Sequence, residues 1–126
     1  MNCKFLFFIF LLLFLAGCVK NEAVEPINLH PAEFKEIIDS GDVFLVDVHI
    51  PEQSHIKGTD AVIPFDKLKE NLDKLPKDKT IPIAVYCRSG SMSVQASKEL
   101  SDIGYKHIYN LDGGVNAWRA QGFEIE

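Results

Sequence analysis

The sequence predicts an α/β domain in which a mainly parallel sheet is flanked by helices on both faces. Strand-like apolar segments alternate with helix-like segments along the chain, which is the order that strand–helix–strand units of a parallel sheet require. The run 43–48 is almost continuously apolar, as expected for a strand covered on both faces. No internal repeat breaks this order, so residues 27–126 are expected to form one domain.

Five segments are expected to form the strands of this sheet. They are a weak strand at 27–29, followed by 43–48, 61–63, 81–86 and 107–111. Ligands of parallel sheets bind beyond the carboxyl ends of the strands, so the residues that follow these segments are the first candidates for a functional site.

Four further segments carry helical signals. One begins at Pro31, the next spans 65–75, a third runs from Ser91 until Gly104 stops it, and a short fourth spans 115–121. The side chains expected to share one helical face are Phe34, Ile37 and Ile38 in the first, Phe65, Leu68, Leu72 and Leu75 in the second, and Val94, Ser97, Leu100 and Ile103 in the third.

The N-terminus is predicted to be an export signal. The run from Phe5 to Ala16 is apolar throughout, too short for a membrane span and suited to the core of a secretory signal. The end of this run, Leu15-Ala16-Gly17-Cys18, resembles the processing box of bacterial lipoproteins, which implies cleavage before Cys18 and lipidation of its sulfur. Residues 1–17 are therefore interpreted as a signal peptide and 18–26 as a lipidated tether to a membrane, in the periplasm or at a cell surface. An ordinary signal peptide or an uncleaved anchor is the alternative.

Charge and cysteine content narrow the function. The formal net charge of −5 argues against a nucleic-acid partner, because nucleic acids favour clustered positive charge. Cys3 leaves with the signal and Cys18 becomes a thioether, so Cys87 is expected to be the single free thiol. A lone thiol outside the cytoplasm is a liability unless it is buried or used. No carboxylate pair or histidine cluster suggests a metal.

Cys87 is the predicted nucleophile. It follows the strand 81–86, and a short turn of Arg88, Ser89 and Gly90 leads directly into the helix that begins at Ser91. This arrangement aims backbone N–H groups and the positive end of a helix dipole at the sulfur, which favours the reactive thiolate.

Several separated motifs resemble the rhodanese (sulfurtransferase) domain family over nearly all of 27–126. In chain order they are Leu45-Val46-Asp47-Val48-His49, Glu52, His55-Ile56-Lys57-Gly58, Ala61-Val62-Ile63-Pro64, the loop from Val85 through Cys87 to Ser93, and Leu111-Asp112-Gly113-Gly114-Val115-Asn116-Ala117-Trp118. The resemblance implies a single rhodanese-like domain whose Cys87 attacks a sulfane sulfur and holds it as a persulfide. A small donor such as thiosulfate, and a thiol or cyanide as acceptor, are the implied partners, with a redox protein as a further candidate. The persulfide is the covalent intermediate, and no cofactor is expected.

The loop after Cys87 is expected to bind the substrate. Its residues are Arg88, Ser89, Gly90, Ser91, Met92 and Ser93. Arg88 is the electrostatic partner for an anionic donor, and converging N–H groups would stabilise the negative persulfide. The hydroxyls of Ser89, Ser91 and Ser93 are expected to add hydrogen bonds to this site, and for Ser91 the alternative is to cap the helix. Met92 stands where many thiosulfate-using members have a basic or small polar residue, which leaves Arg88 as the one positive charge of the loop.

Other signature residues are predicted to be structural. Asp47 is expected to orient a loop or neighbouring backbone, and His55 to be a satisfied structural histidine. His49 replaces the usual arginine and is expected to alter a buried polar network without changing the chemistry. Two glycines, Gly113 and Gly114, are predicted to allow close backbone approach near the Cys87 loop. Trp118 is predicted to be a core anchor.

Competing functions are weighed against these residues. A cysteine-dependent phosphatase needs an arginine six positions after the nucleophile, where this chain has Ser93. A thioredoxin-like oxidoreductase needs Cys-x-x-Cys, which is absent from the sequence. A non-catalytic rhodanese module, or a redox or metalloid sensor built on Cys87, remains as the alternative to a sulfurtransferase.

Overall fold

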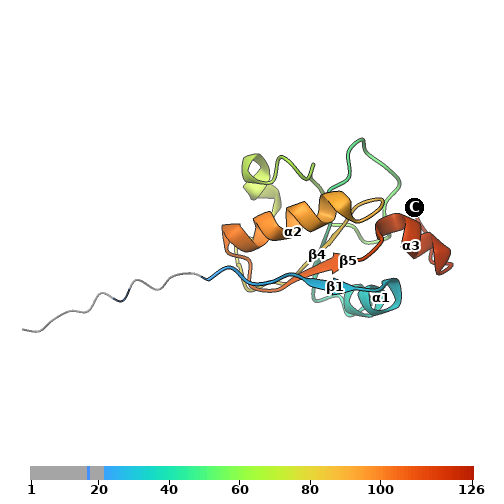
Figure 1. Cartoon of the computed structure of the whole chain (residues 1–126), viewed down its shortest axis with the longest axis horizontal. Helices are drawn as coiled ribbons and strands as arrows, with labels where there is room; N and C mark the ends of the chain where they lie inside the picture. The colour runs from blue at the N-terminus through green and yellow to red at the C-terminus, as the bar shows by residue number, and fades with distance from the viewer. Residues whose placement is uncertain (1–16, 18–21) are drawn as a thin grey trace, which may run out of the picture.

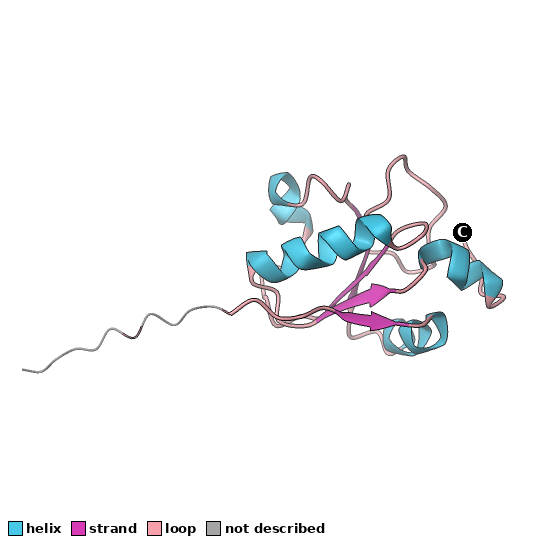
Figure 2. Ribbon diagram, viewed as in Figure 1, coloured by secondary structure: helices cyan, strands magenta, loops and turns pink. Residues whose placement is uncertain are grey.

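The computed structural model describes Gly17 and residues 22–126, which form a five-stranded parallel sheet flanked by helices (Figures 1 and 2). The strands are β1 (Ile27–Leu29), β2 (Phe44–Asp47), β3 (Ala61–Val62), β4 (Ile83–Tyr86) and β5 (Ile108–Leu111), in the spatial order β1-β5-β4-β2-β3. The helices are α1 (Pro31–Asp39), the 3-10 helix η1 (Lys69–Lys74), α2 (Ser91–Ile103) and α3 (Gly114–Ala120). All neighbouring strands are parallel, which confirms the predicted fold class.

Helices cover both faces of the sheet and enclose two layers of core. Figure 1 shows α2 along one face and α1 on the other. The α2-face core includes Val46, Ile63, Ile83, Val85, Leu100 and Ile108. The α1-face core includes Phe34, Leu45, Ala84, Leu111, Val115 and Trp118. Trp118 contacts the rings of Phe34 and Phe123 edge-on, which confirms its predicted role as a core anchor.

The register of the central strands decides where the signature residues point. Asp47 at the end of β2 lies opposite Tyr86 at the end of β4. Side chains alternate along a strand, so Tyr86 joins the α1-face core while Cys87, one residue later, joins the α2-face core. Two polar regions thus arise at the carboxyl ends of adjacent strands, on opposite faces of the sheet.

The α-helix predicted for 65–75 is wrong in type and extent. Only η1 forms there, and the backbone leaves helical geometry at Asn71. The Asn71 amide donates to the Lys67 carbonyl (2.8 Å), and such local side-chain bonds compete with α-helical pairing. Leu68 and Leu75 are buried whereas Leu72 is exposed, so two apolar anchors hold this segment without a continuous helical face.

The residues just before β1 pack against the domain. Val24, which the sequence places in the tether, contacts the α2-face core, and its carbonyl accepts a hydrogen bond from the Ser101 hydroxyl of α2 (2.5 Å). Except for Gly17, the predicted signal peptide and the lipidated Cys18 lie outside the described residues. Within the described part of the chain, no helix is long and apolar enough to cross a membrane.

Candidate active site

Cys87 lies at the carboxyl end of β4 with its side chain almost fully covered. Only 1% of the residue is exposed, and the sulfur lies between the α2-face core and the first turn of α2. It is the free cysteine of the described chain.

The loop after Cys87 folds back so that a backbone donor points at the sulfur. The N–H of Gly90 donates to the Cys87 Sγ at 3.0 Å. Gly90 has a left-handed conformation (φ 102°), and a Cβ there would lie 3.3 Å from the Gly113 nitrogen. Glycine is therefore required by both the turn and its packing, and the turn places a donor where negative charge on sulfur is stabilised.

The start of α3 forms the second support of the loop. The N–H groups of Val115 and Asn116 donate to the carbonyls of Cys87 (2.9 Å) and Arg88 (3.0 Å). A Cβ on Gly114 would stand 2.5 Å from the Arg88 oxygen and 2.6 Å from the Cys87 oxygen. This contact agrees with the predicted close backbone approach and explains the glycine at position 114.

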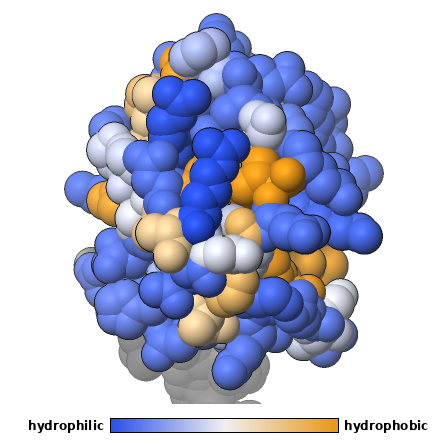
Figure 3. Space-filling model, turned by 90° about the vertical axis from the view of Figure 1, so that its right-hand side faces the viewer, coloured by the Kyte–Doolittle hydropathy of each residue, from blue (hydrophilic) through white to orange (hydrophobic). Residues whose placement is uncertain are grey.

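The predicted substrate-binding residues divide between the surface and the interior of the domain. Arg88, Ser89 and Ser91 are exposed, and Met92 is half-buried against the α2-face core. Arg88 forms no ion pair among the described residues, so its guanidinium is available to an anion. In Figure 3, the end of the molecule where α2 begins and α3 lies shows a small hydrophobic patch bordered by strongly hydrophilic side chains.

Two serines of the loop differ from their simplest interpretation. The N-cap of α2 is Gly90, without a side-chain capping bond, so Ser91 does not cap the helix. Its hydroxyl lies 3.4 Å from that of Ser89 at the surface. Ser93 is fully buried and lies beside the sulfur, with its Oγ 3.4 Å from the Cys87 Sγ and 3.1 Å from the Gly90 carbonyl. Substrate binding by these residues stays a prediction.

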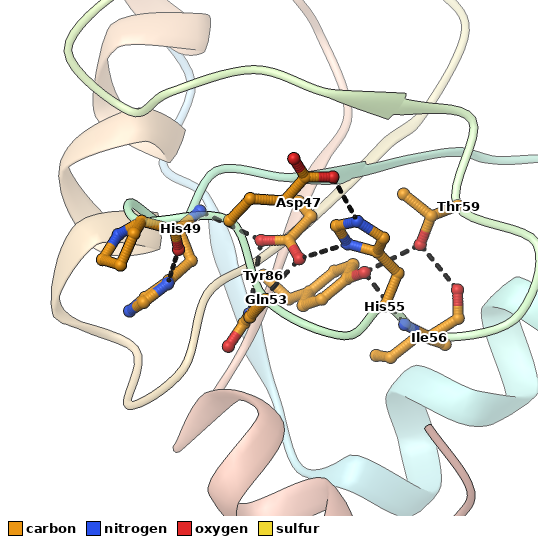
Figure 4. A network of polar contacts seen from close by, with 9 residues as sticks. Asp47, His49, Gln53, His55, Ile56, Thr59 and Tyr86 are labelled. Atoms are coloured by element: carbon orange, nitrogen blue, oxygen red, sulfur yellow. Dashed lines mark hydrogen bonds and ion pairs between the residues drawn. The ribbon is translucent and has the colours of Figure 1, made fainter. Parts of the chain in front are cut away.

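A separate polar cluster surrounds Asp47 on the opposite face of the sheet (Figure 4). The Asp47 carboxylate is buried and accepts hydrogen bonds from the His49 backbone N–H (3.0 Å), the Gln53 amide (3.2 Å) and the His55 Nδ1 (2.8 Å). The other ring nitrogen of His55 contacts Glu52 (3.2 Å). These contacts agree with the structural roles predicted for Asp47 and His55.

A closed ring of hydrogen bonds fastens the next part of this loop to β4. The Ile56 N–H donates to the Tyr86 hydroxyl (3.0 Å), which pairs with the Thr59 hydroxyl (2.7 Å), and Thr59 donates to the Ile56 carbonyl (2.6 Å). Burial raises the pKa of Tyr86, so this hydroxyl stays neutral and keeps its proton for the ring.

The His49 side chain takes no part in the buried cluster through its ring. Its Nδ1 lies 2.7 Å from the Pro51 carbonyl at the surface, and only its backbone N–H reaches Asp47. The predicted effect of His49 on a buried polar network is thus limited to that backbone contact. Among the described residues, no group of three metal-ligating side chains converges.

The fold and the cysteine loop define a class of protein: a small α/β domain that holds a cysteine between a parallel strand and a helix, with a backbone N–H of the following loop donating to the sulfur. The Rhodanese-like domain family model matches residues 30–121, and the chain belongs to that family.

Similar proteins support the same assignment. The chain is 36% identical over 93 residues to a sulfurtransferase of Allochromatium vinosum, covering 72% of this chain and 85% of that protein. It is 38% identical over 71 residues to the thiosulfate sulfurtransferase PspE of Escherichia coli, covering 54% and 67%. The crystal structure of a rhodanese-related protein from Thermoplasma volcanium superposes with a TM-score of 0.68 at 26% identity, covering 79% and 97%. These relatives confirm the expected family, fold and enzyme class, a sulfurtransferase of the rhodanese type.

Proposed function

We propose that this chain is a membrane-tethered sulfurtransferase that acts outside the cytoplasm and carries sulfane sulfur as a persulfide on Cys87. The observation that carries the proposal is the Gly90 N–H held 3.0 Å from the Cys87 sulfur. The exposed Arg88 at the mouth of the same loop supplies the charge that an anionic donor needs.

The reaction is two displacements at sulfur. In loading, the Cys87 thiolate attacks the outer sulfur of thiosulfate, a new S–S bond forms, and sulfite leaves with the electron pair of the broken S–S bond. In discharge, cyanide or a thiolate attacks the outer sulfur of the persulfide, and the electron pair returns to Cys87. The outer persulfide sulfur carries negative charge, which N–H donors of the loop stabilise.

The burial of the sulfur favours a small donor. Cys87 is nearly covered, and the loop carries one cation, the exposed Arg88. The relative PspE of Escherichia coli is a thiosulfate sulfurtransferase, which makes thiosulfate the first donor to test. Polysulfide and glutathione persulfide are the donors to compare with it, because neither depends on a sulfonate contact.

The membrane tether rests on the sequence Leu15-Ala16-Gly17-Cys18. Lipidation of Cys18 would hold the domain at a membrane surface in the periplasm or on the cell exterior. The wild-type protein is expected to begin at Cys18 and to carry the added mass of acyl chains there, as mass spectrometry of the N-terminal peptide measures. A wild-type protein without this added mass would refute the lipid anchor without affecting the assignment of Cys87.

The decisive experiment measures sulfur on Cys87 in the full-length protein. After addition of thiosulfate, the peptide that contains Cys87 is expected to gain the mass of one sulfur and to lose it when cyanide is added. A Cys87→Ser protein is the control. No gain from thiosulfate, polysulfide or glutathione persulfide by a folded protein would refute sulfur transfer and favour the non-catalytic module. A stable sulfenic acid without turnover would favour the sensor.

A further inference from the structure

The buried hydroxyl of Ser93 lies between two groups with different needs. Its oxygen is 3.1 Å from the Gly90 carbonyl, which can only accept a hydrogen bond, and 3.4 Å from the Cys87 sulfur. The side chain is 0% exposed, so no solvent reaches this hydroxyl. The Ser93 hydroxyl therefore has one hydrogen to donate and its oxygen lone pairs to accept with, and it must form both hydrogen bonds with these.

The direction of these hydrogen bonds depends on the charge of the sulfur. When Cys87 is a thiol, its S–H donates to the Ser93 oxygen and the Ser93 O–H donates to Gly90. A thiolate has no hydrogen to give and needs donors. The Ser93 hydrogen can then turn from the carbonyl to the sulfur by rotation about the Cβ–Oγ bond, while every heavy atom stays in place.

We propose that Ser93 is a positioning residue whose hydroxyl reverses its hydrogen bond as Cys87 changes charge. It acts as a second donor to the thiolate, beside the Gly90 N–H at 3.0 Å. The inference rests on the proposed sulfur transfer for its role in turnover, but the hydroxyl reversal itself concerns only the thiol and thiolate. Ser93 thus contacts the sulfur from the interior of the domain and does not contact the sulfur-donating substrate, since it is fully buried.

The two half-reactions use this donor differently. In loading, the thiolate is the attacking group. A hydrogen bond to it increases the fraction of Cys87 present as thiolate but makes each thiolate less nucleophilic. In discharge, the acceptor bonds to the outer sulfur, the S–S bond breaks, and the electron pair moves onto the Cys87 sulfur. The Ser93 hydroxyl then receives the developing charge and promotes departure of the thiolate.

The test compares buried serines on one helix. Ser93→Ala removes the proposed donor, and Ser93→Thr keeps a hydroxyl at the same position. Ser97→Ala is the matched control, because Ser97 is also buried on α2 but its hydroxyl has no hydrogen-bond partner among the described residues. All are made in the full-length chain, and the rate of iodoacetamide alkylation of the Cys87 peptide is followed by mass spectrometry across pH.

Ser93→Ala is expected to shift the pH midpoint of alkylation upward and to lower the rate below that midpoint roughly tenfold, as for a lost hydrogen bond to a charged group. Ser97→Ala and Ser93→Thr are expected to keep the wild-type midpoint. A Ser93→Ala profile that superposes on that of Ser97→Ala would overturn the proposal. A folded Ser93→Thr protein that behaves like Ser93→Ala would also overturn it, because the hydroxyl would then not be the cause.

Single-turnover kinetics separate this role from a merely structural one. At a pH where Cys87 is fully ionised in both proteins, Ser93→Ala is expected to load with thiosulfate at least as fast as wild type, because its thiolate is the more nucleophilic, whereas cyanide discharges its persulfide roughly tenfold more slowly. Equal slowing of both steps at every pH would assign Ser93 a structural role only. If no donor loads Cys87, the proposed function fails, while the alkylation profiles still decide whether Ser93 donates to the thiolate.

Discussion

The Cys87 loop and the Asp47 cluster lie at the ends of adjacent strands, yet they are built on opposite principles. Around Cys87 the fixed donors belong to the backbone, with Gly90 donating to the sulfur and Val115 donating to the Cys87 carbonyl. Around Asp47 side chains do most of the bonding, and a buried carboxylate collects an amide, an imidazole and one backbone N–H.

The difference indicates what each region is for. A backbone cradle leaves the sulfur with donors but no permanent counter-charge, so charge can move on and off the cysteine during a reaction. The Asp47 carboxylate is saturated by its partners and has no free face for a substrate. We infer that the cysteine loop serves the proposed sulfur transfer, whereas the Asp47 cluster holds the loop 49–59 against the sheet. Substitutions can test whether the two are as independent as they look.

The largest effect is expected from Gly114→Ala, which would place a methyl group 2.5 Å from the Arg88 oxygen. The cysteine loop must move to accept it, and a displacement of about 1 Å costs on the order of a hundredfold in rate. Gly122→Ala is the control, since φ there is also positive (81°) but nothing lies within 4 Å of the added carbon. It should cost about 1–2 kcal/mol of stability and leave sulfur transfer unchanged. Near-normal turnover by Gly114→Ala would contradict the backbone cradle.

A large loss of stability is expected from Asp47→Ala. The change leaves Gln53, His55 and the His49 N–H without their shared acceptor, which should lower the free energy of unfolding by about 3 kcal/mol. Urea unfolding measures this, and Asp112→Ala, which removes an exposed carboxylate near His30, should cost less than about 1 kcal/mol. Alkylation of Cys87 in the folded Asp47→Ala protein should change little. A loss of cysteine reactivity as large as the loss of stability would show that the two regions are coupled.

An intermediate effect, confined to activity, is expected from Arg88→Gln. Removal of the charge-assisted contact should lower kcat/KM for thiosulfate about tenfold, whereas the free energy of unfolding should change by less than about 0.5 kcal/mol. Arg119→Gln, on the exposed side of α3, provides the control for net charge. Equal losses in the two variants would mean that Arg88 acts only through the overall field of the domain.

The smallest effect is expected from the pH dependence of His55. Burial lowers the pKa of this imidazole, but hydrogen bonds and charge from Asp47 and Glu52 outweigh burial and raise the pKa above its ordinary 6.5. Protonated His55 therefore stabilises the fold fully below pH 6.5, and this contribution is lost as the pH rises through the raised pKa. The stability difference between wild type and His55→Gln should shrink between about pH 6 and pH 8. A stability difference between the two proteins that grows with pH would contradict a raised pKa for His55.

The sequence predicted the cysteine loop well because its geometry is encoded locally. A strand, a glycine turn and a helix start within a few residues, so the position of Cys87 follows from chain order alone. The close approach of Gly114 to the Cys87 loop agrees with the prediction made for the two adjacent glycines of the carboxyl-terminal signature.

The parts that could not be predicted depend on contacts between distant segments or on competing local bonds. Paired backbone bonds between His55 and Glu126 (2.8 Å each) join residues far apart in sequence and leave no local pattern. The 65–75 segment has helical spacing, but the Asn71 side chain bonds to the backbone and the helix is not completed. A hydrogen bond from the Ser93 hydroxyl was expected from the family's loop, but its burial beside the sulfur depends on how α2 packs and has no local sequence pattern.

The hydrogen bond between the Ser101 hydroxyl and the Val24 carbonyl limits the length of the proposed tether between the domain and the membrane. If Cys18 is held in a bilayer, as proposed, the chain from Cys18 to Val24 can span about 20 Å at most. The domain would then stay within a short distance of the membrane surface and would not diffuse through the whole compartment. A thiol carrier anchored in the same membrane would meet Cys87 at a high effective concentration, whereas a freely diffusing carrier would gain nothing from the tether.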